Sequence, residues 1–208
     1  MHIAIKHSKL AFTLIELLVV VTIIGILAGL SVPAFKMAMD AAKKAQAGSM
    51  ISNLKVALNA YQADYGTWPA FLAASGNSDS TEISSYDSNG VKLYNTLIGN
   101  LNNSDATDAN PRGTVYMEFT KKDLTSGNGN VFNGTSTLNA AGFMDPWGQP
   151  YWIKVDGNYD NQIDNLPNKS GSSDTINTSI AIWSLGVQTA PIKDSSSGGD
   201  RKKYITSW

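Results

Sequence analysis

Residues 11–35 read AFTLIELLVVVTIIGILAGLSVPAF, and this stretch decides how the chain is built. From Leu17 to Phe35 it contains no charged side chain. A helix that crosses the hydrocarbon core of a bilayer needs about 20 mainly apolar residues, so the stretch is long enough to span a membrane. The residues before it carry Lys6 and Lys9, and basic residues ahead of a first span stay in the cytoplasm. We therefore expect a single-pass membrane helix with a cytoplasmic N-terminus.

Two simpler interpretations of this stretch are a cleaved secretory signal peptide and a plain signal anchor. The apolar core of a signal peptide is usually about 7–15 residues long and ends at a small-residue cleavage site. This run is longer and continues into a polar helical pattern. A plain anchor leaves Glu16 unexplained, because a carboxylate inside the bilayer costs about 2.5–3.5 kcal/mol on insertion scales. Acids in such positions usually have a partner, so we expect Glu16 to be functional.

FTLIELLVVVTIIGILAGLSVPAF resembles the N-terminal segment of type IV pilins and of type II secretion pseudopilins. The resemblance implies that a prepilin peptidase in the inner membrane cleaves between Ala11 and Phe12 and methylates the new amine. The family usually has Gly where Ala11 stands. The resemblance also implies that Glu16 neutralises the N-terminal amine of a neighbouring subunit in a filament. Gly25 and Pro33 match the family's helix-loosening positions, and because Pro33 lacks a backbone donor we expect the helix to kink or melt locally there.

Composition narrows the classes of function. Loss of Lys6 and Lys9 with the leader would reduce 16 basic residues to 14 against 17 acidic ones, changing the net charge from −1 to −3. This balance gives no electrostatic reason to expect nucleic-acid binding. The chain has no cysteine, and both histidines, His2 and His7, lie in the leader. The mature chain would lack the commonest general base and the usual nucleophile dyads, so we do not expect an enzyme.

The predicted plan is a leader at 1–11, a transmembrane and assembly helix at 12–35, and a periplasmic head at 36–208. Apolar residues at three- and four-residue spacing predict that the helix continues to about Tyr65, where Gly66 ends it. The stripe expected to face the core is Met50, Ile51, Leu54, Ala57, Leu58 and Tyr61. A variable region at 73–142 is rich in Ser, Asn, Gly and Asp, and there we expect one short helix from Val91 to Leu101.

Three segments have the composition of strands, namely Thr114–Phe119, Tyr151–Val155 and Thr178–Gly186. Asp145, Pro146 and Gly148 fit a type I turn. The sequence DPWGQPY around this turn is similar to a motif of the major pseudopilin of type II secretion, and WSLG at 183–186 and ITSW at 205–208 also resemble that subunit. The resemblance implies an α+β, pilin-like fold in which the long N-terminal helix packs on a small antiparallel sheet.

VDGNYDNQIDN at 155–165 has the oxygen spacing of a calcium loop. Its candidate ligands are Asp156, Asn158, Asp160, the carbonyl of Gln162, and Asp164. Calcium takes about six to eight oxygens, and short acids at alternate positions of a tight turn direct their oxygens to one point. Asn161 stands at the usual Gly and Pro167 at the usual bidentate Glu, so we expect weak affinity. The alternative is a polar hairpin turn, for which Asp, Asn and Gly are the common residues.

The major pseudopilin family also binds calcium in a loop after its last strand, which corresponds here to residues 187–200. Gln188 and Thr189 stand where the family has acid and Gly, which leaves Asp194 and Asp200 as candidate ligands. The alternative is a flexible Ser/Gly loop. One sequence does not decide which of the two loops binds metal.

These resemblances together imply a structural subunit of a type II secretion pseudopilus, a filament that aids protein export across the outer membrane. Its partners would be prepilin peptidase, like subunits and the inner-membrane secretion platform. One alternative is a type IV pilus subunit for adhesion, motility or DNA uptake. Another is a glycan-binding module displayed on a filament, using Trp68, Trp147, Trp152 and Trp208, although core packing accounts for tryptophans more simply.

Overall fold

The computed structural model describes residues 13–72, 79, 82–120, 123–124, 142–164, 166, 175–186 and 205–207. The chain divides into two compact units, Met1–Ala42 and Lys43–Trp208. The leader, the predicted cleavage site at Ala11 and Phe12, and the second candidate calcium loop at 187–200 lie outside the described residues. So do most of the residues from 121 to 141, within the predicted variable region.

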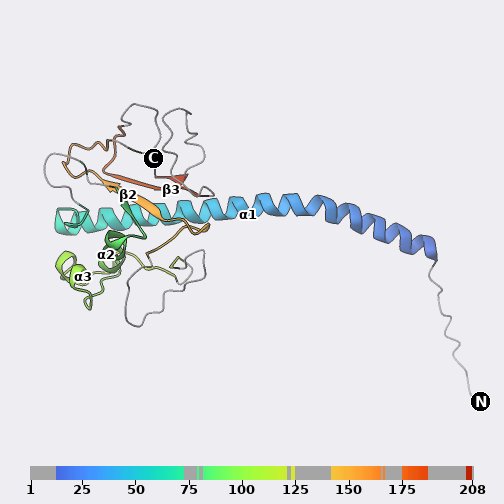
Figure 1. Cartoon of the computed structure of the whole chain (residues 1–208), viewed down its shortest axis with the longest axis horizontal. Helices are drawn as coiled ribbons and strands as arrows, with labels where there is room; N and C mark the ends of the chain where they lie inside the picture. Colours follow the sequence, from blue (N-terminus) through green and yellow to red (C-terminus); the bar gives the residue numbers. More distant parts are fainter. Residues whose placement is uncertain are drawn as a thin grey trace, which may run out of the picture. The chain divides into compact units, whose positions relative to one another are not determined.

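One helix, α1 (Leu14–Tyr65), runs through the boundary between the units (Figure 1). It contains a stretch that is long and apolar enough to cross a membrane, and none of that stretch is buried. The backbone stays helical through Pro33, so the local melting expected there is not seen. A proline removes only its own N–H bond, and the turns on either side keep theirs. At the other end Gly66, with φ of 72°, stops the helix as predicted, because a positive φ suits glycine.

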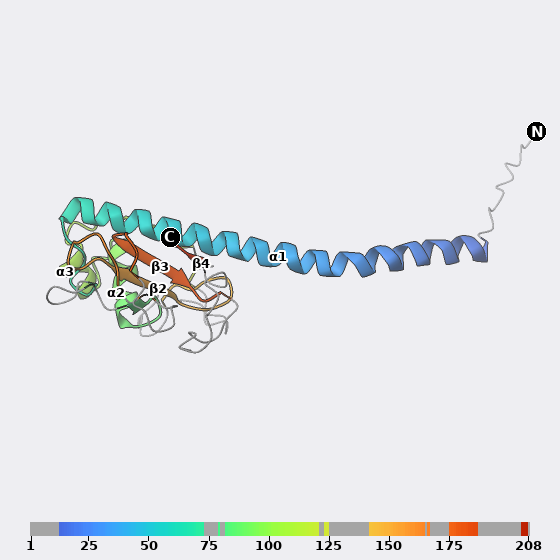
Figure 2. The same cartoon turned by 90° about the horizontal axis from the view of Figure 1, so that it is seen from above.

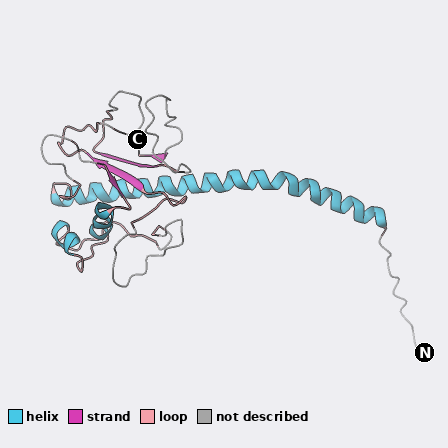
Figure 3. Ribbon diagram, in the orientation of Figure 1, coloured by secondary structure: helices cyan, strands magenta, loops and turns pink. Residues whose placement is uncertain are grey.

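The second unit contains an antiparallel sheet, drawn in magenta in Figure 3. The sheet has four strands in the order β1-β2-β3-β4. The strands are β1 (Ile83–Ser84), β2 (Tyr151–Val155), β3 (Ile180–Ser184) and β4 (Ile205–Thr206). The two central strands are the ones predicted from sequence, and they pair with Ile153 opposite Ile182. The turn predicted before β2 is also present, because the N–H of Gly148 donates to the carbonyl of Asp145 at 2.9 Å.

The last part of α1 lies along one face of this sheet (Figure 2). The buried stripe on the helix is the predicted one, extended by Ala47. Leu54 and Leu58 are fully buried and belong to one cluster with Ile153 and Ile182 of the sheet. Each such side chain contributes roughly 1.5–3 kcal/mol relative to an exposed one. The three- and four-residue spacing of the stripe therefore fixes which side of α1 faces the sheet.

The opposite face of the sheet is covered as well. Trp183 and Ala181 of β3 pack there in a second, smaller cluster with Ile163, Leu166 and Leu185. Coverage on both faces explains why β3 reads as a continuous run, IAIWS, in which all five residues are buried. A strand that faced water on one side would alternate apolar with polar residues instead.

Two short helices, α2 (Ser88–Leu97) and α3 (Ser104–Ala109), precede the central strands. The first replaces the helix expected from Val91 to Leu101, and it begins earlier because Asp87 caps it by accepting a bond from the N–H of Gly90 at 2.8 Å. The prediction of a strand at Thr114–Phe119 was wrong. The N–H groups of Tyr116 and Met117 instead donate to the carbonyl of Leu97, so this segment is tied to the end of α2 rather than to the sheet.

Candidate functional site

The first unit presents an apolar helix with no intramolecular cover among its described residues. From Leu14 to Met39 the large apolar side chains of α1 that the structure describes are exposed, for example 62% for Leu18 and 67% for Phe35. The hydroxyls of Thr22 and Ser31 in this stretch bond to the backbone of their own helix. Thr22 donates to the carbonyl of Leu18 at 2.9 Å, and Ser31 donates to that of Leu27 at 2.7 Å. Polar groups satisfied within the helix leave an outer surface compatible with lipid or with other apolar helices.

Glu16 is the single charged side chain between Thr13 and Phe35. Its Oε2 accepts bonds from the backbone N–H of Thr13 at 2.9 Å and from the Thr13 hydroxyl at 2.7 Å. Thr13 and Glu16 therefore form the two ends of a capping box, which satisfies donors at the start of α1. Among the described residues Oε1 of Glu16 has no hydrogen bond, so one carboxylate oxygen remains open to a partner. The predicted cleavage site next to it lies outside the described residues.

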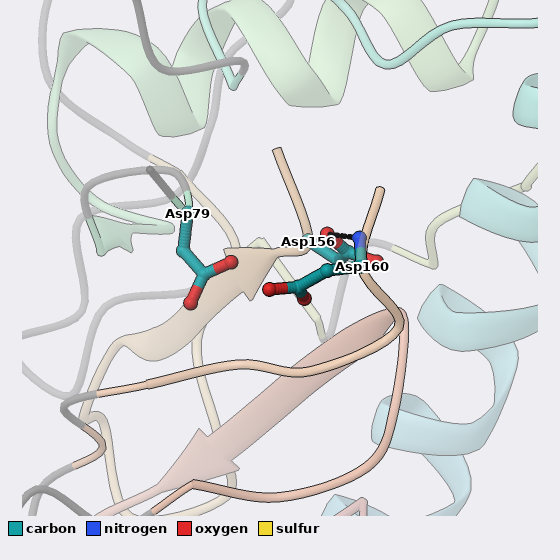
Figure 4. Close-up of side chains that lie close together, drawn as sticks. All are labelled: Asp79, Asp156 and Asp160. Carbon is teal, nitrogen blue, oxygen red and sulfur yellow. Dashed lines mark hydrogen bonds between the residues drawn. The ribbon is translucent and has the colours of Figure 1, made fainter. Parts of the chain in front are cut away.

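In the second unit three carboxylates converge after β2 (Figure 4). They belong to Asp79, Asp156 and Asp160, and one oxygen of each lies within 4.8 Å of the others. Calcium–oxygen bonds are about 2.3–2.6 Å, so ligands across one ion lie up to about 5 Å apart. The spacing of these oxygens therefore fits a single calcium ion.

Asp156 organises the loop around this cluster. It is 3% exposed, and its two oxygens accept the N–H groups of Asp160 at 3.2 Å and Asn161 at 2.7 Å. Its own carbonyl accepts the indole N–H of Trp68 at 2.7 Å. Asn161 has φ of 64°, as the prediction of a left-handed residue there required, and Tyr159 has φ of 61°. The loop is thus closed by the acid at its first position, as in an Asx-type turn.

The remaining predicted ligands have separate positions. Asn158 exchanges bonds with Asp160, through its side-chain amide at 3.0 Å and its side-chain oxygen at 3.1 Å. Gln162 is exposed, and its N–H donates to Asp160 at 2.9 Å. The Asp164 carboxylate is not one of the three that converge. Its side chain accepts a bond from Thr175, and its carbonyl accepts one from the Lys154 ammonium.

Asp79 is the residue that the sequence did not predict. Its Oδ2 accepts the N–H of Asp164 at 2.6 Å across 85 positions of sequence, while its Oδ1 is buried without a hydrogen-bond partner among the described residues. Burial raises the pKa of the Asp79 carboxyl; the Asp164 N–H and nearby Lys154 oppose the shift, whereas Asp164 and Asp160 reinforce it. A cation bound at the cluster would stabilise the ionised Asp79 carboxylate and so offset the free-energy cost of burying its charge.

The tryptophans proposed as glycan platforms lie in less accessible positions than the sequence suggested. Trp68 is 3% exposed, and Trp147 and Trp152 are half-buried. Trp208 lies outside the described residues. Core packing accounts for Trp68. The Trp68 side chain also joins the turn after α1 to the loop after β2 through its bond to Asp156.

Comparisons with known proteins agree with the geometry of the first unit. Residues 6–32 match the family described as the prokaryotic N-terminal methylation motif. Fimbrial protein EcpC of Eikenella corrodens is 39% identical over 72 residues, which are 35% of this chain and 47% of that protein. A fimbrial protein of Neisseria meningitidis serogroup A is 32% identical over 87 residues, 42% of this chain and 51% of that protein.

The type IV major pilin protein PilE of Neisseria gonorrhoeae is 30% identical over 111 residues, 53% of this chain and 66% of that protein. The chain thus spans about half the length of the first two relatives and somewhat more of the third. No solved structure matches it significantly. The methylation motif, the named relatives, and the long helix packed on a small antiparallel sheet together support a type IV pilin-like family for this chain.

Proposed function

We propose that the protein is a structural subunit of a type IV pilus, and not an enzyme. The observation that carries this proposal is the exposed apolar stretch of α1 from Leu14 to Val32, in which Glu16 is the single charge and which lies inside the segment that matches the methylation motif. The names of the relatives, which are fimbrial proteins and type IV major pilins, favour a pilus over the type II secretion pseudopilus expected from the sequence.

The proposed sequence of events begins in the inner membrane, with the head in the periplasm. Prepilin peptidase removes residues 1–11 and leaves Phe12 as a methylated N-terminus. The apolar surfaces of neighbouring α1 helices then pack against one another, which removes them from lipid. Glu16 pairs through its open Oε1 with the amine of the next subunit, because a carboxylate in an apolar bundle is tolerable beside a cation.

A pseudopilus subunit is the second candidate, with an inner-membrane secretion platform as its partner. The turn from Asp145 to Gly148 supports it. This turn is built from the DPWGQPY motif that resembles the major pseudopilin, and the carboxylate of Asp145 holds it by accepting the N–H groups of Trp147 at 2.9 Å and Gln149 at 2.7 Å.

A deletion strain complemented with the wild-type gene separates the two candidates. For a pilus subunit, we expect deletion to remove surface filaments seen by electron microscopy and to leave secretion of outer-membrane-exported enzymes unchanged. Loss of secretion with surface filaments intact would support the pseudopilus instead. If neither changes, the filament function is wrong.

Glu16→Gln tests the role of the charge within the same strains. Glutamine keeps an acceptor for Thr13, so the capping box is retained, but it cannot neutralise an amine. We expect normal amounts of processed protein and at least a tenfold loss of filaments. Thr22→Val, which removes only a hydroxyl bonded to its own helix, is the matched control and should assemble normally. Normal assembly of Glu16→Gln would contradict the proposed pairing.

We also propose that the cluster of Asp79, Asp156 and Asp160 binds calcium. Support comes from the spacing of the three oxygens and from the buried oxygen of Asp79 that has no other partner among the described residues. Bound calcium would neutralise the converging carboxylates and hold the loop after β2 to the segment that carries Asp79. Three carboxylates without a bidentate Glu favour the weak, extracellular class of affinity, of about 10⁻⁴–10⁻³ M.

Thermal unfolding in calcium and in chelator tests this proposal. We expect calcium to raise the melting temperature of the wild type, and we expect Asp79→Asn to lose that response. Without calcium the same variant should be as stable as the wild type or more so, because burial disfavours the Asp79 charge. Glu118→Gln, an exposed acid elsewhere in the head, should respond like the wild type. An unresponsive wild type would leave the loop as a polar turn.

A further inference from the structure

A cleft at the C-terminal end of α1 is separate from both candidate sites described above. Its volume is about 620 Å³, and its lining comes from α1, from the turn that follows it, from Lys92 of α2 and from the end of α3. Pockets that hold small molecules have volumes of about 300–1,000 Å³, so the cleft is large enough for one.

The aromatic residues of the cleft are fixed in place by bonds at their polar ends. The hydroxyl of Tyr61 donates to the carbonyl of Ala109 at 2.6 Å, and that of Tyr65 to the side chain of Asn110 at 2.9 Å. The indole N–H of Trp68 donates to Asp156. These bonds leave Tyr61 and Trp68 as a rigid, nearly buried floor, with Tyr65 and Phe71 as half-buried walls. Rigid aromatic groups reduce the entropy lost when a ligand binds.

The polar groups at the cleft carry both signs of charge. Lys92 supplies a cation, Asp108 an exposed carboxylate, and Thr67 an exposed hydroxyl. A purely cationic ligand fits poorly, because the guanidinium of Arg112 already lies 5.2 Å from the ring centroid of Tyr65. A purely apolar ligand would strip water from the exposed carboxylate of Asp108 without replacing its hydrogen bonds.

We propose that this cleft binds a neutral saccharide of one or two pyranose units. The C–H face of such a ligand packs against Phe71, and its hydroxyls exchange hydrogen bonds with Lys92, Asp108 and Thr67. A sugar combines both kinds of surface in one uncharged molecule. The proposal goes beyond filament assembly and does not depend on which kind of filament the subunit forms.

The test uses the detergent-solubilised full chain on an array of neutral, anionic and cationic glycans, followed by titration with the best neutral hit. Ala70→Trp fills the cleft from an exposed position, so it should not disturb folding. Ala63→Trp, an exposed alanine of α1 that does not line the cleft, is the matched control.

We expect a neutral saccharide to bind the wild type and Ala63→Trp equally, and to bind Ala70→Trp at least tenfold more weakly. Asp108→Asn should weaken binding several-fold while the melting temperature stays unchanged. Absence of any neutral hit, binding of charged glycans alone, or equal binding by Ala70→Trp would each overturn the proposal.

Discussion

The two parts of α1 are one continuous helix with opposite surroundings. Before Ala42 its described large apolar side chains are exposed, whereas after Lys43 a stripe with the same kind of residues is buried against the sheet. The difference shows that only the second part stabilises the folded subunit, and that the first part can lower its free energy only through lipid or other molecules.

A pair of leucines, one in each part of α1, should differ most strongly when mutated. Leu54→Ala removes a fully buried side chain and should reduce the free energy of unfolding of the head by about 2–5 kcal/mol. Leu18→Ala removes a side chain that is 62% exposed and should leave it unchanged. Denaturant unfolding in detergent, followed by tryptophan fluorescence, measures both. Equal losses in the two variants would show that the first part of α1 also stabilises the folded head.

A pair of glycines gives the next largest effect. A Cβ at Gly90 would lie 2.4 Å from the carbonyl oxygen of Ser84, so Gly90→Ala forces the start of α2 away from β1 and should cost about 1–3 kcal/mol. A Cβ at Gly25 would meet nothing within 4 Å. Gly25→Ala should therefore leave head unfolding unchanged, and any defect it shows should appear in assembly. A stable Gly90→Ala head would mean that the packing around Ser85 is looser than described.

The smallest effect concerns pH and the buried acid of the head. Burial raises the pKa of Asp145, and bonds from Ser184 and from the N–H groups of Gln149, Trp147 and Gly186 only partly oppose the shift. The folded head then holds this proton more tightly than the unfolded chain, so the contribution of Asp145 to stability falls as pH rises from about 4 through its raised pKa. The contribution of Asp145 is measured as the difference in free energy of unfolding between the wild type and Asp145→Asn across pH 4–7.

The wild type should lose stability relative to Asp145→Asn as pH rises in that window. A gain would show that the hydrogen bonds outweigh burial. Glu118→Gln, at an exposed acid, controls for the general charge of the head and should follow the wild type.

Local pattern was enough to predict the parts of the fold that depend on neighbouring residues. The stripe from Met50 to Tyr61, the stop at Gly66 and the central strands β2 and β3 each follow from spacing or from a backbone preference, and the structure confirms them. The wrong strand at Thr114–Phe119 shows the limit. Alternation predicts an extended segment, but the available partner was the carbonyl of Leu97 rather than a sheet edge.

Local pattern likewise predicted only some of the residues in the candidate calcium site. Asp156 and Asp160 follow from spacing within one loop, whereas Asp79 joins them across a long sequence separation that only the folded chain closes. Nothing in the surrounding residues 73–82 marks Asp79 as different from other polar loop residues. Contacts between residues far apart in the sequence depend on where the folded core places the loops. A local sequence pattern does not contain that information.

If the first part of α1 is an assembly surface, cleavage before Phe12 should release it. Intact mass and N-terminal sequencing of the membrane-extracted protein, from cells with an active prepilin peptidase, test this. We expect a chain that begins at N-methylated Phe12. A chain that begins at Met1 would contradict it and leave the apolar helix as a simple membrane anchor.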